Sequence, residues 1–221
     1  MTGAAVAKMK RILVSRLGRA FGDIWYWGAI AATVASCLFM RYARMADAPP
    51  GDVFAALACG GWMLTPLALG AYLISNFNEE LRGRHASELL TFGAARGALA
   101  ASYLTVCAAL IAVCAVLTVL PVALACGVGF AAAVRAVVLR FALLCAAAFL
   151  NMCAMPLLGN AAVIPPAVTM LTWQYIERWA VENPVLCLAG TGYAQPVLVS
   201  AAVIAGAAAL FAVILERVEL K

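Results

Sequence analysis

Residues 98–120 read ALAASYLTVCAALIAVCAVLTVL and contain no charged side chain. An apolar run of about twenty residues is long enough to cross the hydrocarbon core of a bilayer as a helix. The rest of the chain has a similar character: 67% of its 221 residues are hydrophobic and 11% are charged, and its mean hydropathy is +1.01. Since a soluble protein carries roughly a quarter charged residues, the composition excludes a soluble globular domain.

The same pattern recurs along the sequence and predicts an all-α polytopic membrane protein with about six transmembrane helices. We expect residues 1–221 to form one transmembrane domain, with spans 1 and 2 in residues 24–75 and spans 3 to 6 in residues 98–215. The predicted spans are Ile24–Met40, Val53–Ser75, Ala98–Leu120, Ala136–Leu158, Ala161–Tyr175 and Pro196–Leu215. Residues 216–221 form a short charged tail. Proline at positions 165 and 166 predicts a kinked or broken fifth span.

Residues 1–22 differ from the spans because they are amphipathic. Leu13 and Leu17 lie on an apolar stripe, whereas the opposite and flanking positions carry basic or polar residues. This pattern predicts an interfacial helix on the membrane surface. Its basic residues, which we expect at the lipid headgroups, include Lys8, Arg11, Arg16 and Arg19. Because basic residues favour the cytoplasmic side, we expect the N-terminus there, and six spans place the C-terminus on that side too. The expected location is a bacterial cell membrane.

The connection between the third and fourth predicted spans is ambiguous. Residues 122–134 are weakly apolar and contain glycine, so they are interpreted either as a loop or as an additional membrane element. Arg135 and Arg140 then begin the fourth span on the outer side, against the usual distribution of basic residues. The favoured interpretation is that both side chains snorkel outward to the membrane surface.

Composition and spacing also restrict the chemistry. The basic residues mostly flank apolar runs and set orientation, so we expect no nucleic-acid partner. The eight cysteines lie almost entirely in apolar stretches without a CxxC pair, which favours packing roles over a metal or disulfide framework. His85 is the only histidine and lies in a polar loop, and the chain has no phosphate-binding GxxxxGK[ST] loop. We therefore expect neither an enzyme nor a bound cofactor.

Residues 76–97 form the one strongly polar internal stretch, and we expect them on the cytoplasmic side. Leu89 and Leu90 add apolar side chains to a segment that also contains Glu79, Glu80 and Arg96. Two interpretations remain open on composition: a short helix that transmits force from a soluble partner, or a solvated loop whose charges only fix orientation.

The order of these features resembles the ABC-2 type permeases. In that family the segment between the second and third spans has a glutamate, a glycine, a Leu-Leu pair, a proline and an arginine. Glu80, Leu89, Leu90 and Arg96 match in one register, whereas Gly83 falls one residue early and Gly93 stands where proline is usual.

The resemblance implies the permease subunit of an ATP-driven exporter. On that basis Glu79, Glu80, Gly83, Leu89, Leu90 and Arg96 form a coupling helix that docks a separate ABC ATPase subunit, and the N-terminal helix is its connecting helix. A second permease chain, identical or different, completes the pathway within the membrane lipids. The small size is similar to permeases of bacteriocin and lantibiotic immunity or export, which implies a hydrophobic or amphipathic substrate. The alternatives are a non-transporting membrane scaffold and a carrier or channel that acts alone.

Overall fold

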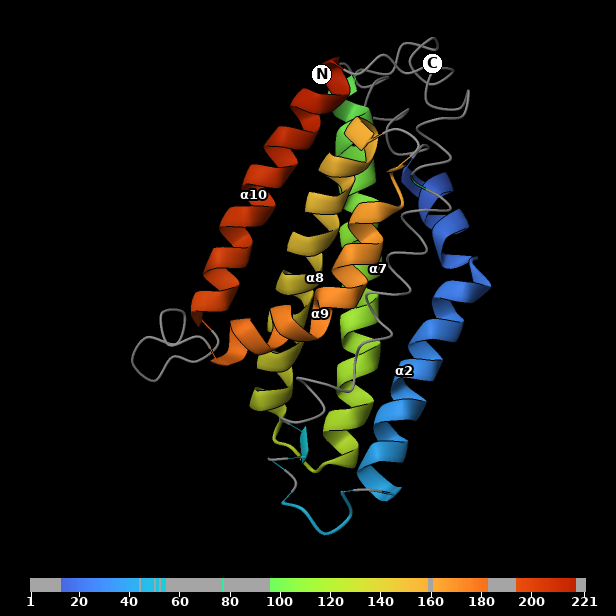
Figure 1. Cartoon of the computed structure of the whole chain (residues 1–221). Coiled ribbons are helices and arrows are strands. Elements are labelled where there is room, and N and C mark those ends of the chain that lie inside the picture. Colours follow the sequence, from blue (N-terminus) through green and yellow to red (C-terminus); the bar gives the residue numbers. More distant parts are fainter. Residues whose placement is uncertain are drawn as a thin grey trace.

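A computed structural model describes residues 13–43, 45–49, 51, 53–54, 77, 96–158, 161–182 and 194–217, and the regular elements in these ranges are helical. Residues 13–21 form a short helix that leads toward α2. The labelled helices are α2 (Ile24–Ala43), α7 (Arg96–Ala125), α8 (Phe130–Leu158), α9 (Ile164–Glu182) and α10 (Ala194–Arg217). Figure 1 shows them as one elongated bundle. The predicted all-α architecture is confirmed for this part of the chain.

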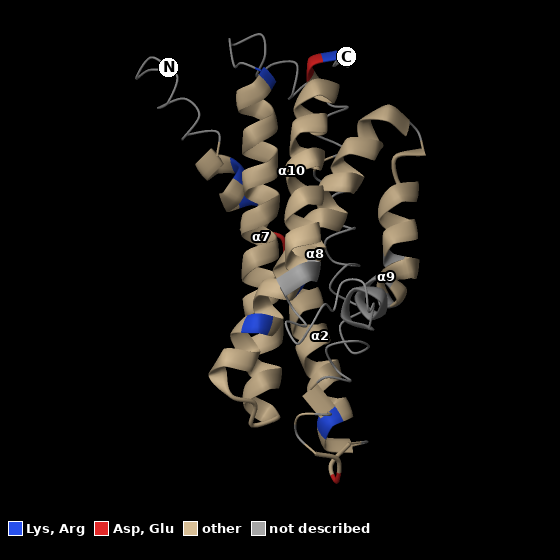
Figure 2. Cartoon of the chain, turned by 90° about the vertical axis from the view of Figure 1, so that its left-hand side faces the viewer, with Lys and Arg blue, Asp and Glu red and all other residues tan. Residues whose placement is uncertain are grey.

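Four of the described helices are long and apolar enough to cross a membrane: α2, α7, α8 and residues Val197–Arg217 of α10. Figure 2 colours the charged residues along the ribbon and shows how sparsely they occur in these helices. The membrane character predicted from composition is therefore confirmed. The predicted second span, Val53–Ser75, lies outside the described residues beyond its first two positions. α9, which contains most of the predicted fifth span, is not among the four.

α8 lies at the centre of the bundle and packs against α7, α9 and α10, while α7 also contacts α2 and α10. α2 and α7 run in the same direction, and α8 and α10 return toward the end where α7 begins (Figure 1). We call this the Arg96 end, because Arg96 opens α7 there. The opposite end, where α7 finishes and α8 starts, is called the Gly127 end.

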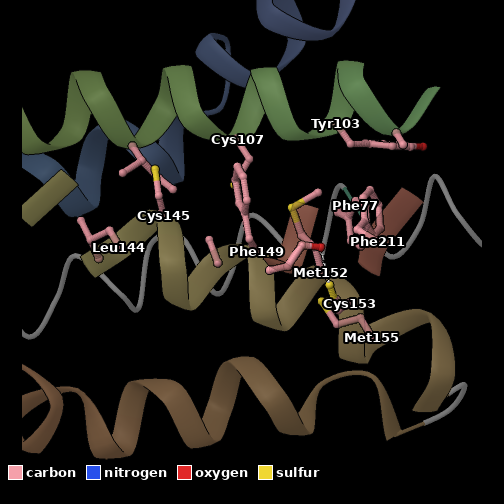
Figure 3. Packing of buried hydrophobic residues seen from close by; sticks show 14 of the residues in the cluster. Phe77, Tyr103, Cys107, Leu144, Cys145, Phe149, Met152, Cys153, Met155 and Phe211 are labelled. Atoms are coloured by element: carbon pink, nitrogen blue, oxygen red, sulfur yellow. Dashed lines mark hydrogen bonds between the residues drawn. The ribbon is translucent and has the colours of Figure 1, made fainter. Parts of the chain in front are cut away.

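The helices pack through small, sulfur-containing and aromatic side chains. A buried cluster between α7, α8 and α10 includes Cys107, Cys145, Phe149 and Met152, and Figure 3 shows these side chains between the helix ribbons. The six described cysteines are all buried. Each fills space in a tightly packed interior, in the way that a small apolar side chain does.

The connection between α7 and α8 is shorter than predicted. α7 continues through Pro121 to Ala125 and α8 begins at Phe130, so residues 122–134 are mainly the ends of two helices. Gly127 has φ +62°. The amide of Gly127 donates to the carbonyl of Leu124, and that of Val128 to the carbonyl of Ala123, both at 3.0 Å. This is a Schellman motif, which ends α7 and reverses the chain within residues 126–129.

The start of α9 differs from the predicted kink or break at the two prolines of the fifth span. Pro165 and Pro166 do not break this helix, which runs from Ile164 to Glu182. Both prolines lie in its first turn, where a backbone N–H has no partner within the helix. Proline is tolerated there because its fixed φ suits a helix start and its missing donor is not needed.

Candidate functional site at the Arg96 end of the bundle

The predicted site residues fall into two groups. Arg16, Arg19 and Arg96 lie in the described part of the chain. The remaining predicted residues lie outside the described residues, namely Lys8, Arg11, Glu79, Glu80, Gly83, Leu89 and Leu90. The described residues that flank the predicted coupling segment on either side are Phe77 and Arg96.

Arg96 binds the C-terminal end of α10. Its Nη1 atom donates a 2.6 Å hydrogen bond to the backbone carbonyl of Glu216 and a 3.1 Å bond to that of Leu215. These carbonyls belong to the last turn of a helix, where no further turn supplies amide donors and the helix dipole favours a cation. Arg96 therefore caps the last described helix although it lies at the start of the third predicted span.

Phe77 packs against the same two helices from the other side of the segment. Its side chain is 3% exposed. The ring meets that of Tyr103 on α7 edge-to-face, with 5.0 Å between centroids, and lies 5.7 Å from the ring of Phe211 on α10. Figure 3 shows Tyr103, Phe77 and Phe211 grouped together. Aromatic pairs at these separations add stability beyond the area they bury.

The N-terminal helix joins this group through Arg16. Its Nη1 donates a 2.6 Å hydrogen bond to the hydroxyl of Ser102, and its guanidinium carbon lies 3.9 Å from the centre of the Tyr103 ring. Arg16 is only 8% exposed. The expectation that Arg16 faces the lipid headgroups is therefore wrong, whereas Arg19 is exposed.

The physical reason lies in the packing of the N-terminal helix. Leu13, Leu17 and Phe21 pack beside a buried cluster that includes Ala20 and residues of α2 and α7. Arg16 follows Leu13 by three positions, so the two residues share one side of the helix. Because that side packs against α7, Arg16 lies next to Ser102 and Tyr103.

Sequence reasoning missed Phe77, Ser102, Tyr103 and Phe211, because each lies in or beside a run interpreted simply as membrane-spanning. The one available signal was the Ser102-Tyr103 pair, two adjacent polar groups within an uncharged and mostly apolar stretch.

A second polar group lies within the bundle, around Cys114 of α7. Arg140 of α8 is 2% exposed and acts electrostatically on the Cys114 thiol. The interpretation that Arg140 snorkels outward is therefore wrong, although Arg135 is exposed as that interpretation requires. Because α8 begins at Phe130, Arg140 lies about three turns into the helix, roughly 15 Å along its axis. At that position it faces α7.

The α8–α9 contact contains a further polar pair. The Thr169 hydroxyl lies 3.1 Å from the Asn151 side-chain oxygen and 2.9 Å from the carbonyl of Pro165. Trp173, one turn further along α9, is fully buried. This pair fixes α9 against α8 close to the turn that joins them.

These side chains mainly link helices. No group of three or more histidine, cysteine, aspartate or glutamate side chains suited to a metal ion occurs within the described ranges. The polar and aromatic contacts at the Arg96 end join the N-terminal helix, Phe77, α7 and α10 into one packed group. Comparisons of the chain with protein-family models, curated proteins and solved structures found no match.

Proposed function

We propose that this chain is the membrane-spanning permease subunit of an ATP-driven ABC exporter. The observation that carries the proposal is the attachment of both flanks of residues 78–95 to α10. Phe77 packs on Phe211, and Arg96 binds the carbonyls of Leu215 and Glu216. A partner that displaced this segment would therefore act directly on α10 and α7.

The described residues also favour a further crossing between α2 and α7. Phe54 packs near Cys126 at the Gly127 end, whereas Phe77 packs with Tyr103 and Phe211 at the Arg96 end. The chain therefore changes ends between these two phenylalanines. The 22 residues between them are about as many as a helix needs to cross the hydrocarbon core. This supports the predicted second span, which with the four long apolar helices would make five crossings.

The distribution of basic residues supports an orientation with the Arg96 end in the cytoplasm. Arg16 and Arg19 of the N-terminal helix are associated with that end, and so are Arg96 and Arg217 at the limits of α7 and α10. Arg41 and Arg135 lie at the limits of α2 and α8 toward the other end. Because cytoplasmic flanks carry more arginine and lysine, the predicted coupling segment would face the cytoplasm of a bacterial cell.

In the proposed cycle, ATP binding in two partner ATPase subunits draws them together and moves the segment that contains Glu79, Glu80, Gly83, Leu89 and Leu90. The movement passes through Phe77 and Arg96 into α7 and α10. A second permease chain forms the other half of the pathway. The apolar character of the bundle favours a hydrophobic or amphipathic substrate, such as a peptide antibiotic or a lipophilic drug, which would enter from the membrane or the cytoplasm.

The test is co-purification with candidate ABC ATPases and measurement of ATP hydrolysis in nanodiscs, with a rhodamine-labelled amphipathic peptide and a lipophilic cationic dye as probes. We expect the complex to hydrolyse ATP faster when a probe is present. Leu90→Ala and Glu80→Gln should weaken ATPase capture, whereas the matched control Asp47→Asn, at the Gly127 end, should not.

Three results would refute the proposal. The first is capture of an ATPase that neither coupling variant weakens, and the second is a stable ATPase complex that never responds to either probe. The third is transport of the probes in liposomes without any ATPase. The second result indicates a scaffold, and the third a carrier or channel that acts alone.

A further inference from the structure

We propose that Arg16 is a positioning residue that couples the N-terminal helix to the segment 78–95 through the Tyr103 ring. The inference rests on the proposed function, because it assigns Arg16 a part in transmitting ATPase movement. It depends on four side chains from four parts of the chain that meet at the Arg96 end: Arg16, Tyr103, Phe77 and Phe211.

The burial of Arg16 is the first step. A guanidinium group withdrawn from water loses hydration energy, which only close partners compensate. The Ser102 hydroxyl, 2.6 Å from Nη1, supplies one partner, and the Tyr103 ring face, 3.9 Å from the guanidinium carbon, supplies another. Ser102 is itself fixed, because its hydroxyl lies 2.7 Å from the Leu99 carbonyl within α7. Arg16 therefore has a defined position against α7.

The second step is the shared use of the Tyr103 ring. Arg16 lies over this ring, while Phe77 meets it edge-to-face at 5.0 Å between centroids. A cation is attracted to the electron-rich face of an aromatic ring, and an edge-to-face pair matches the positive edge of one ring to the face of another. A shift of Tyr103 therefore disturbs both the N-terminal helix and the residue that precedes segment 78–95.

The third step extends the contact to α10, because Phe77 also lies 5.7 Å from Phe211. Figure 3 shows Phe77 next to Phe211, with Tyr103 close by on α7. The N-terminal helix is thus tied to α7 directly and to α10 through two further rings. If Arg16 were lost, the apolar packing of Leu13, Leu17 and Phe21 would remain, but the path from Phe77 through the Tyr103 ring to the N-terminal helix would be broken.

The first experiment needs only the isolated chain in nanodiscs. Backbone amide exchange would be measured in Arg16→Ala, in Arg16→Lys and in the matched control Arg19→Ala, an exposed arginine on the same helix. We expect Arg16→Ala to raise exchange about tenfold in residues 13–21, consistent with the loss of one charged hydrogen bond and its ring contact. It should also raise exchange in peptides that contain Phe77, which Arg16 affects through Tyr103. Arg16→Lys should recover part of this protection, and Arg19→Ala should match the parent.

A double-mutant cycle separates this coupling from simple loss of packing. Tyr103→Leu removes the ring, and once the ring is absent Arg16→Ala should raise exchange in residues 13–21 by clearly less than it does in the parent, because only the bond to Ser102 remains to be lost. Additive effects of the two substitutions would overturn the proposal. Unchanged exchange at Phe77 in Arg16→Ala would also overturn it, because the N-terminal helix and the segment would then be independent.

The second experiment uses the ATPase complex with the rhodamine-labelled peptide. We expect the ratio of peptide-stimulated to basal ATP hydrolysis to fall toward one in Arg16→Ala and to recover partly in Arg16→Lys. A parent chain that binds no ATPase would refute the proposed function, while the exchange data would still judge the physical link between Arg16 and Phe77. A functional complex whose stimulation ratio is unchanged in Arg16→Ala would refute the coupling role alone.

Discussion

The hydroxyl of Tyr26 donates a 2.7 Å hydrogen bond to the backbone carbonyl of Leu110, 84 positions later in the chain. The backbone amide of Cys114, four residues further along α7, lies near the same hydroxyl. Leu110 and Cys114 are four residues apart and would normally bond to each other within α7. Tyr26 therefore inserts its hydroxyl beside this helical turn, and it attaches α2 to the middle of α7 at a position that is buried.

Replacing Tyr26 by phenylalanine should destabilise the bundle by about 1 kcal/mol, because the hydrogen bond to Leu110 is lost while the ring is kept. The change would be measured by reversible denaturation in mixed micelles. Tyr42→Phe is the control, since Tyr42 lies on the same helix but is 65% exposed. Equal effects of the two substitutions would show that the hydroxyl of Tyr26 contributes nothing specific.

Arg96→Gln should loosen the C-terminal end of α10. The substitution removes the cation and the bonds to the carbonyls of Leu215 and Glu216, which we expect to cost about 1 kcal/mol for a partly exposed contact. Amide exchange in the last turn of α10 would rise, while exchange in α8 would stay unchanged. Arg135→Gln, at an exposed arginine on α8, is the control, and a similar response in α10 to that change would contradict the capping role.

Gly127→Ala should destabilise the α7–α8 turn by about 1 kcal/mol, because an alanine at φ +62° is strained although its Cβ would meet no neighbouring atom. Gly129→Ala is the matched control, two residues away, where a Cβ also meets nothing and φ is not in the left-handed region. Thermal unfolding of both variants would be compared with the parent. Indistinguishable midpoints for the two variants would argue against the strain at position 127.

The four-residue turn also provides a test of orientation. With Cys59 and Cys187 replaced by alanine, Gly129→Cys should react with a membrane-impermeant maleimide added to intact cells. Glu216→Cys should react only after the membrane is opened, because we place the two positions on opposite sides. Labelling of both from the same side would contradict the proposed topology.

Cys126 in the same turn should react much more slowly than the introduced cysteine. Its side chain is 2% exposed, and burial raises the pKa of its thiol, against the opposing effect of Arg41. A raised pKa leaves less thiolate at neutral pH, so the labelling rate should be low there and should increase as the pH rises toward that pKa. A rate at neutral pH equal to that of the cysteine at position 129 would contradict this.

The apolar runs were sufficient to locate α2, α7, α8 and α10, because a helix in a bilayer must satisfy its backbone hydrogen bonds internally over a fixed length. Helix ends were less predictable. The third span was predicted to end at Leu120, yet α7 continues through Pro121 to Ala125, because the left-handed conformation at Gly127 ends the helix. Pro165 and Pro166 were interpreted as the site of a kink or break, although they lie in the first turn of α9.

The predicted site shows the same division. Arg96 was selected from a local motif, but its bonds to the carbonyls of Leu215 and Glu216 depend on residues more than a hundred positions away. Arg16 was assigned to the membrane surface because a helical projection shows one helix and not the neighbour it packs against. Arg140 was assigned to the surface because the fourth span was predicted to begin at Ala136, whereas α8 begins at Phe130 and carries Arg140 into the bundle.

Local sequence patterns were enough to identify a helical membrane protein with a basic amphipathic N-terminal segment and one polar internal segment. These properties follow from composition and from residue spacing along the chain, because apolar runs partition into the bilayer and charged segments remain in water. The grouping of Arg16, Tyr103, Phe77 and Phe211, and the bond from Tyr26 to Leu110, became visible only in the packed bundle. In a chain that is apolar on almost every helix face, hydrophobicity does not specify which faces pair. Close packing and a few buried hydrogen bonds select the partners.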